Sequence, residues 1–161
     1  MVGRNGAKAA ARLRVLIADD EQAIRLMCRV NLELDGIEVI EAADGVEAVG
    51  LALARQPDVA ILDIRMPLLD GWQVADRLRA SPATSAVALI FLTAETGDDA
   101  KARARERGAL LIGKPFNPLQ LAVIAVAAAA TRKSAPAAAA ARTKRGATKT
   151  GGSSPEPPSD T

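Results

Sequence analysis

The residues of this sequence best suited to chemistry are five polar side chains, each placed where a short apolar segment ends. They are Asp19, Asp20, Asp63, Thr93 and Lys114. Asp63 is the most unusual, because it closes the apolar run Val-Ala-Ile-Leu and an unpaired buried charge is expensive. A carboxylate in that position is expected either at the open end of a sheet or beside a cation.

The three carboxylates favour a divalent cation if the fold brings them together. Two carboxylates about 4 Å apart repel by about 4 kcal/mol at an effective dielectric constant near 20, so a cluster needs a cation or a raised pKa. Carboxylate oxygens without histidine or thiolate partners suit Mg²⁺. With Lys114 to neutralise a phosphoryl group and Thr93 to donate a hydrogen bond to it, Asp63 becomes a nucleophile. The predicted chemistry is Mg²⁺-dependent formation of an aspartyl phosphate.

Five apolar segments alternate with five segments of helical periodicity, and these elements must position the polar residues. Strands are predicted at residues 13–18, 37–41, 58–63, 87–92 and 109–113, and helices at residues 21–34, 44–55, 71–80, 98–107 and 117–130. Five such units predict an α/β fold with a doubly wound parallel sheet. Right-handed crossovers place the carboxyl ends of its strands at one edge, where ligands bind. Glu41, which closes the second strand, is left out because that strand is expected at the side of the sheet.

The amino-acid composition limits the size of the fold and the kinds of site that this chain can form. The chain has 161 residues, of which 49% are hydrophobic, and this is enough for one domain with a core and an appendage. It contains no histidine and one cysteine, which excludes Ser-His triads, histidine metal ligands, an internal disulfide and cysteine-cluster zinc sites. Cys28 lies on the apolar face of a predicted helix, so we expect it to be a small core residue.

The two ends of the chain differ from its centre in charge. Residues 12–130 carry 13 basic and 17 acidic side chains, whereas residues 1–11 carry two basic and no acidic ones, and residues 131–161 carry six and two. We therefore predict a basic extension at 1–11, a folded domain at 12–130, and a disordered tail at 131–161 that is first basic and then rich in Pro, Gly and Ser. The apolar segments are too short for a signal peptide or a membrane span, and a cytoplasmic protein without membrane contact is expected.

Four motifs in order give the sequence a specific resemblance. They are Ala-Asp-Asp-Glu at 18–21, Leu-Asp-Ile-Arg-Met-Pro-Leu-Leu-Asp-Gly at 62–71, Leu-Thr-Ala at 92–94 and Lys-Pro-Phe at 114–116. Together they resemble the receiver domain of two-component response regulators, over about residues 12–130. The resemblance implies a flavodoxin-like five-stranded sheet of order 2-1-3-4-5 with five helices. Pro115 also fits the resemblance, because receivers commonly have a cis peptide at this place, although the sequence itself leaves the isomer open.

The same resemblance implies roles by position. Asp63 corresponds to the phosphoacceptor, Thr93 to the switch hydroxyl and Lys114 to the cation that faces the phosphoryl group. Asp19 and Asp20 correspond to the acidic pair that binds Mg²⁺ with Asp63, and the backbone carbonyl of Arg65 to a further metal ligand. Receivers take the phosphoryl group from a phosphohistidine of a histidine kinase or a histidine phosphotransfer protein. Such a protein is not an enzyme toward other substrates, because it catalyses only its own phosphorylation and dephosphorylation.

Two features depart from the usual pattern of the family. Receivers usually have Tyr or Phe at the switch position three residues before the lysine, and this chain has Leu111 there and no tyrosine. Signalling through an aromatic side chain at that position is therefore left open. Arg65 and Glu95, each two residues after a site residue, flank the site. We expect them to pair, to screen the aspartyl phosphate from water, and so to tune its lifetime.

Output is expected to pass by protein contact, because no effector domain follows the predicted receiver. The helix at 117–130 is apolar on more than one face, which indicates a docking surface for a partner or a second copy. The alternative is that its small apolar side chains simply tolerate solvent. A non-switching receiver fold that acts only as an interaction module is a second possibility for the function.

A third, less favoured possibility is contact with nucleic acid through the basic tail. Its cations are Arg132, Lys133, Arg142, Lys144, Arg145 and Lys149. A charge run without stacking aromatics is more typical of a solvated linker. Two enzyme or carrier classes with related folds are disfavoured. A phosphatase of the haloacid dehalogenase type needs a second Asp at position 65, and a flavin carrier needs a phosphate-binding loop where Asp19 and Asp20 stand.

Overall fold

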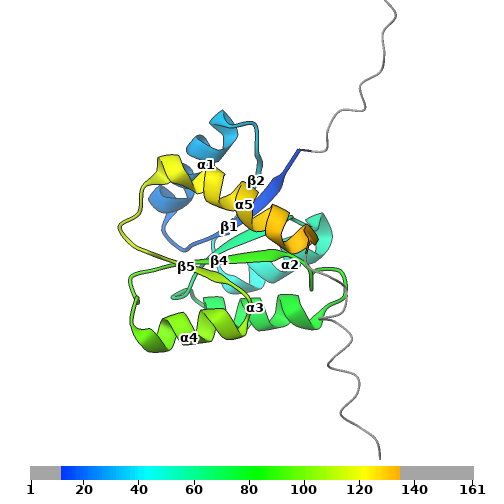
Figure 1. Ribbon diagram of the computed structural model, residues 1–161, viewed down its shortest axis with the longest axis vertical. Coiled ribbons are helices and arrows are strands. Elements are labelled where there is room, and N and C mark those ends of the chain that lie inside the picture. Colours follow the sequence, from blue (N-terminus) through cyan, green and yellow to red (C-terminus); the bar gives the residue numbers. More distant parts are fainter. Residues whose placement is uncertain (1–11, 135–161) are drawn as a thin grey trace, which may run out of the picture.

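Short apolar segments and helices alternate along residues 12–134, the part of the chain that the computed structural model describes (Figure 1). The strands are β1 (Arg14–Ala18), β2 (Glu38–Ala42), β3 (Val59–Asp63), β4 (Ala88–Thr93) and β5 (Leu110–Gly113). The helices are α1 (Gln22–Leu34), α2 (Gly45–Arg55), α3 (Gly71–Ala80), α4 (Asp98–Glu106), the 3-10 turn η1 (Pro118–Gln120) and α5 (Leu121–Ser134). Each predicted element is present within these residues, with ends that coincide or differ by at most four residues.

The five strands form one parallel sheet of order β2-β1-β3-β4-β5, and the predicted fold is confirmed. β3 lies at the centre, and all five of its residues are buried. The strand order reverses between β1 and β3, which lie side by side. In open parallel sheets ligands bind beyond the carboxyl ends of the strands at such a point. The residues that follow β1 and end β3 are therefore brought together at a suitable place.

Two layers of helices cover the sheet, because side chains of each strand alternate between its faces. Leu16 and Leu62 belong to a core cluster with residues of α2, α3 and α4, whereas Val15 and Ile61 belong to a second cluster with residues of α1 and α5. Figure 1 shows α1 and α5 on one side of the sheet and α3 and α4 on the other. Cys28 is fully buried in the second cluster, as predicted, and burial raises the pKa of its thiol to about 11.

The start of α3 is fixed against the end of β3 by a capping box and a glycine. The Asp70 carboxylate accepts the backbone N–H of Gln73, whose side chain in turn accepts the N–H of Asp70. A Cβ on Gly71 would stand 2.4 Å from the carbonyl oxygen of Asp63 and 2.8 Å from Cα of Ile64. Only glycine leaves room for α3 to begin this close to the strand that carries Asp63.

The last helix begins and ends later than predicted. We expected a helix at residues 117–130, but α5 begins at Leu121 and continues to Ser134. The Arg132 guanidinium donates to the carbonyl oxygens of Ser85 and Ala86, and this contact with the α3–β4 connection holds the final turn. Basic residues in the last turn are also favourable beside the helix dipole. The predicted basic extension at 1–11 and the rest of the predicted tail, 135–161, lie outside the described residues.

Among the described helices, none is both long and apolar enough to cross a bilayer.

Candidate functional site

Four hydrogen bonds fix Asp19 at the junction of β1 and α1. It is only 2% exposed, and its backbone N–H donates to the carbonyl oxygen of Ala42. Its Oδ1 accepts the N–H of Glu21 at 2.9 Å, which turns the chain into α1. Its Oδ2 accepts a hydrogen bond from Lys114 Nζ at 2.9 Å, and its carbonyl oxygen accepts one from Arg25 Nη1 at 2.7 Å. The side chain therefore has a fixed position at the carboxyl edge of the sheet.

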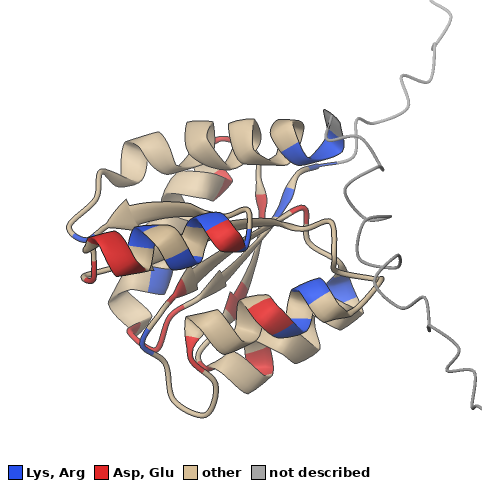
Figure 2. Cartoon of the chain, turned by 60° about the horizontal axis from the view of Figure 1, so that its bottom comes forward, with Lys and Arg blue, Asp and Glu red and all other residues tan. Residues whose placement is uncertain are grey.

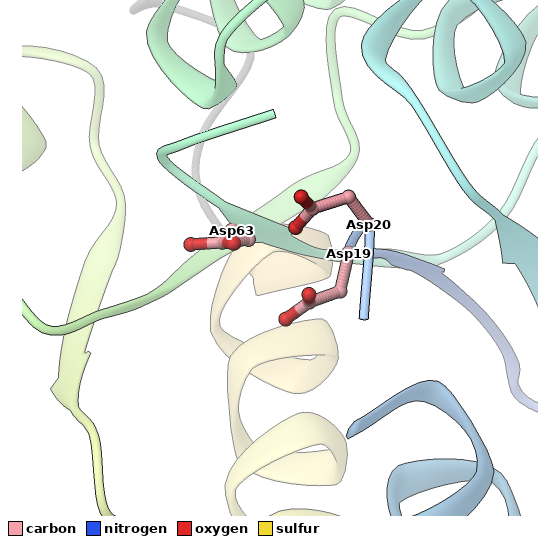
Figure 3. Close-up of side chains that lie close together, drawn as sticks. All are labelled: Asp19, Asp20 and Asp63. Carbon is pink, nitrogen blue, oxygen red and sulfur yellow. The ribbon is translucent and has the colours of Figure 1, made fainter. Parts of the chain in front are cut away.

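Asp63 ends β3 and faces the acidic pair that follows β1. It is 8% exposed, its Oδ2 lies 3.6 Å from Lys114 Nζ, and its Oδ1 accepts the Arg65 N–H at 3.4 Å. One carboxylate oxygen from each of Asp19, Asp20 and Asp63 lies within 4.8 Å of the other two. Figure 3 shows these three side chains gathered at the ends of β1 and β3. The sequence predicted this proximity from the strand ends alone.

The electrostatics of this cluster oppose the ionisation of Asp63. Burial raises the pKa of Asp63, the charge of Asp19 raises it further, and Lys114 acts in the other direction. For Lys114, burial disfavours the charged form, but its hydrogen bond with Asp19 and the charges of Asp19 and Asp63 outweigh burial and raise its pKa. When all four groups are ionised, three negative charges face one positive charge. The cluster keeps an excess of negative charge at a largely buried position.

This donor set fits a hard divalent cation. Carboxylate oxygens with no histidine or thiolate among them are the ligands of Mg²⁺, and a cation would offset the repulsion that burial makes costly. Asp20 is exposed, whereas Asp19 and Asp63 are buried, so the cluster opens to solvent on one side. A small phosphorylated group could approach from that side.

Thr93 and Lys114 reach the same edge from β4 and β5. Thr93 is the last residue of β4 and is 1% exposed, and Asp63 lies opposite its neighbour Leu92 in the register. Its Oγ1 accepts the N–H of Glu95 at 2.9 Å. The backbone N–H of Lys114 donates to the Thr93 carbonyl oxygen at 2.8 Å, and the peptide between Lys114 and Pro115 is cis. The ends of both strands are thus tied together, and Lys114 Nζ bridges to Asp19 and Asp63.

Arg65 and Glu95 form the ion pair that their positions suggested. The Arg65 Nε donates to Glu95 Oε1 at 2.8 Å, and a second guanidinium nitrogen contacts the same oxygen. Both side chains are exposed, by 80% and 44%, and both line a cavity of about 490 Å³ that also reaches Trp72 and Arg103. The pair joins the loop after Asp63 to the loop after Thr93. The backbone N–H of Arg65 also donates to Asp63, so one of the two joined loops contacts the acidic cluster.

Leu111 is partly buried and packs against the core cluster under α2, α3 and α4. It lies opposite Phe91 in the register, and Phe91 contacts Trp72 with ring centroids 4.4 Å apart. A leucine here fills part of this space but offers no hydroxyl. The structure therefore places the predicted switch position beside the aromatic pair of the core.

Glu41 and Arg25 are polar residues near the site whose roles the sequence did not reveal. Glu41 pairs with Arg29 at 2.8 Å and with Arg25 at 3.6 Å. Arg25 also donates to the Asp19 carbonyl oxygen, and its side chain is only 15% exposed. The available signal was weak, because an arginine near the start of a helix is usually a solvated residue. Its contact depends on how α1 lies across the ends of β1 and β2.

The outer side of α5 is apolar. Val123 is 71% exposed and Val126 is 53% exposed, and the 3-10 turn before the helix exposes Leu119. The charged residues of α5 are Arg132 and Lys133 in its last turn, as the colouring in Figure 2 shows. This surface agrees with the apolar pattern read from the sequence.

Comparisons with known proteins agree with this geometry. The sequence pattern of the family described as "Response regulator receiver domain" matches residues 15–143. The transcriptional regulatory protein PdtaR of Mycobacterium tuberculosis is 40% identical over 113 residues, which are 69% of this chain and 54% of the relative. The phosphate regulon transcriptional regulatory protein PhoB of Pseudomonas aeruginosa is 39% identical over 108 residues, which are 66% of this chain and 47% of the relative. The chain thus spans about half the length of these curated relatives.

Solved structures give the same result. The chemotaxis protein CheY4 of Vibrio cholerae has a TM-score of 0.67 and 33% identity, with 73% of this chain and 98% of that chain covered. A CheY-like receiver domain protein from Methanospirillum hungatei has a TM-score of 0.69 and 25% identity, with coverage of 76% and 98%. Receiver domains bind Mg²⁺ at an acidic pocket, and this chain has an acidic cluster of Asp19, Asp20 and Asp63.

Proposed function

Because the chain belongs to the response regulator receiver domain family, we propose that it accepts a phosphoryl group on Asp63 from a phosphohistidine of a partner protein. The observation that carries this proposal is the position of Asp63. It is buried at the end of the central strand, within 4.8 Å of two further carboxylates and beside the cation of Lys114. The donor must be another protein, a histidine kinase or a histidine phosphotransfer protein, because this chain has no histidine. The cytoplasm is the expected place of the reaction, because such kinases use ATP.

The reaction joins an Asp63 carboxylate oxygen to phosphorus as the bond between phosphorus and the donor imidazole nitrogen breaks. The imidazole leaves with the bonding electron pair and takes up a proton. A Mg²⁺ held by Asp19, Asp20, Asp63 and the Arg65 carbonyl would polarise the phosphoryl oxygens. The Lys114 ammonium neutralises charge on the transferred group, and the Thr93 hydroxyl, which accepts the Glu95 N–H, donates its own proton in a hydrogen bond to that group. Hydrolysis of the acyl phosphate later returns the free Asp63 carboxylate.

The Arg65–Glu95 pair is proposed to set the lifetime of the aspartyl phosphate. Its two side chains bridge the loops that follow β3 and β4, so they restrict the approach of water to Asp63. Arg65→Ala removes this bridge and should accelerate dephosphorylation several-fold. A decay rate equal to that of the wild type, measured by loss of radiolabel after removal of the donor, would contradict this role.

Output is proposed to pass through protein contact, with the exposed apolar side of α5 as the docking surface. The same surface could join two copies of the chain in a homodimer. Light scattering before and after phosphorylation distinguishes these outcomes, because a homodimer doubles the mass without any partner. Val126→Glu should disrupt either contact and leave phosphorylation unchanged.

A second candidate is an interaction module with a receiver fold that does not switch. The observation that favours it is Leu111, which packs near Trp72 and Phe91 without the hydroxyl or ring usual at this position. Under this candidate the fold and its contacts persist without phosphorylation. Fluorescence of Trp72, the single tryptophan, provides a test, because a switching receiver should change the surroundings of this core residue.

Phosphorylation itself is tested with acetyl phosphate and Mg²⁺. Intact-mass spectrometry should show the addition of one phosphoryl group, and borohydride trapping should locate it on Asp63. Asp63→Ala should abolish the adduct, and omission of Mg²⁺ should prevent it. A wild-type chain that gains no adduct under these conditions would favour the non-switching module. Transfer from a panel of phosphorylated histidine kinases then identifies the donor by the fastest rate.

Nucleic-acid contact through the tail stays a separate proposal, since most of its cations lie outside the described residues. It predicts DNA affinity that falls steeply with salt and is lost when residues 135–161 are removed.

A further inference from the structure

The peptide that joins Asp19 to Asp20 is held by an arginine from α1. Arg25 Nη1 donates to the Asp19 carbonyl oxygen at 2.7 Å, and that oxygen belongs to the same rigid peptide unit as the Asp20 nitrogen. Asp19 has other anchors on its N–H and its carboxylate, but Asp20 is exposed and follows directly after this peptide. The direction in which the Asp20 side chain leaves the backbone therefore depends on the Arg25 contact.

Arg25 is itself fixed in place. Its side chain is 15% exposed, and its Nε lies 3.6 Å from Glu41 Oε1. Glu41 lies on the adjacent strand β2 and also accepts a hydrogen bond from Arg29 at 2.8 Å. The Glu41 carboxylate offsets the positive charge of Arg25, which would otherwise oppose a cation at the neighbouring acidic cluster. The Arg25 guanidinium therefore orients the Asp19–Asp20 peptide and adds little net positive charge beside the acidic cluster.

We propose that Arg25 is a positioning residue for the divalent-cation site, acting through the Asp19–Asp20 peptide, with Glu41 as its support. This proposal rests on the proposed function, because it concerns the cation that phosphorylation of Asp63 requires. Residues that orient metal ligands without touching the metal typically contribute 10- to 100-fold to affinity. A value near tenfold is expected here, because Asp19 keeps its other contacts when Arg25 is lost.

Arg29 provides a matched control. It lies one turn later on α1, carries the same charge and shares Glu41, but its guanidinium donates to Glu41 and not to the Asp19 carbonyl. Arg25→Met and Arg29→Met therefore remove the same charge from the same helix, and only the first releases the Asp19–Asp20 peptide. If charge alone mattered, both substitutions would strengthen cation binding, because both remove a cation near an acidic cluster.

The test is calorimetric titration of the full chain with MgCl₂ alone, at constant ionic strength. Arg25→Met should raise the Kd for Mg²⁺ about tenfold, and Arg29→Met should change it less than twofold. An unchanged or lower Kd for Arg25→Met, or equal shifts in both variants, overturns the proposal. Thermal unfolding without Mg²⁺ establishes that both variants fold. If Arg25→Met does not fold, Arg25→Leu replaces it, because leucine also lacks a hydrogen-bond donor, and an unchanged Kd there counts equally against the proposal.

Failure of the proposed function gives a different result. A wild-type chain that binds no Mg²⁺ and gains no phosphoryl group would remove the basis for any positioning role. A wild-type chain that binds Mg²⁺ with the same Kd as Arg25→Met would remove only the role of Arg25.

Discussion

The two ends of the parallel sheet hold charged residues in opposite ways. At the amino end, Glu38 accepts contacts from Arg14 at 3.2 Å and Arg55 at 2.7 Å, and Asp58 accepts the backbone N–H of Arg14. These carboxylates are about one-third exposed and each has a cation within 4 Å. At the carboxyl end, the buried carboxylates of Asp19 and Asp63 share Lys114, and the exposed carboxylate of Asp20 lies beside them.

This difference distinguishes the charges at the amino end, which are structural, from those at the carboxyl end, which are suited to binding a ligand. Charges at the amino end are balanced and partly solvated, so their ion pairs contribute little to stability and do not require a bound ligand. Charges at the carboxyl end are unbalanced and buried, so the fold carries an electrostatic cost that a bound cation or phosphoryl group would relieve. Four main substitutions, two of them paired with a control, test this contrast from the largest expected effect to the smallest.

Gly71→Ala should cause the largest loss of stability, because Gly71 lies directly against backbone atoms at the carboxyl end of the sheet. The new Cβ would meet the backbone of Asp63 and Ile64 at 2.4 to 2.8 Å, and backbone atoms cannot move aside cheaply. The free energy of unfolding should fall by about 3 kcal/mol in urea denaturation. Gly50→Ala is the control, because nothing lies within 4 Å of its Cβ and alanine favours the helix by about 1 kcal/mol. Equal effects would contradict the tight packing beneath Asp63.

Lys114→Met removes the lysine that contacts the acidic cluster at the carboxyl end of the sheet, and its effect is compared with that of removing a lysine at the amino end. Removal of Lys114 leaves Asp19 and Asp63 facing each other without a cation, and stability should fall by about 2 kcal/mol, less than for a fully buried pair. Phosphorylation by acetyl phosphate should slow at least tenfold.

Lys133→Met, the control at the amino end, removes a 74% exposed partner of Asp58 at 3.9 Å. It should change stability by less than about 0.5 kcal/mol and leave phosphorylation unchanged. A comparable loss of stability in Lys114→Met and Lys133→Met would contradict the difference between the two ends.

Asp63→Asn should stabilise the chain in the absence of Mg²⁺, by about 1 kcal/mol or roughly 3 °C in Tm. Because the pKa of Asp63 is raised in the folded state, the folded chain binds its proton more tightly than the unfolded chain. Wild-type stability therefore falls as pH rises from the ordinary carboxyl pKa through the raised value. The advantage of the asparagine variant should appear across that window and stay constant above it.

Calorimetry as a function of pH measures this difference, and saturating Mg²⁺ should reduce it. An asparagine variant that is less stable than the wild type at neutral pH would show that the carboxylate is not under electrostatic strain.

Glu38→Ala should have the smallest effect of the four main substitutions, because Glu38 and its two arginine partners are all partly exposed. Loss of the contacts with Arg14 and Arg55 should lower stability by about 0.5 kcal/mol, and added salt should remove most of the difference. The rate of phosphorylation should equal that of the wild type. A loss above about 2 kcal/mol, well beyond the range of exposed ion pairs, would mean that the amino end is as finely balanced as the carboxyl end.

Much of the fold could be predicted because apolar periodicity and strand ends are local properties. Asp19, Asp63 and Thr93 stand at strand ends in the structure as they do in the pattern, and the predicted sheet order is confirmed. The end of α5 was missed because the contact of Arg132 with Ser85 joins residues far apart in the sequence. The contact of Arg25 with the Asp19 carbonyl was missed because it depends on how α1 lies over the sheet edge.

By itself the sequence determined the order of elements, the family and the set of residues that meet at one edge, because residue type and spacing encode burial and strand ends. Only the tertiary structure decided how these residues share their charges. The bridge from Lys114 to Asp19 and Asp63 and the hydrogen bond from Arg25 to the Asp19 carbonyl depend on distances between loops and helices. Such distances follow from how helices pack on the sheet, and no local pattern records them.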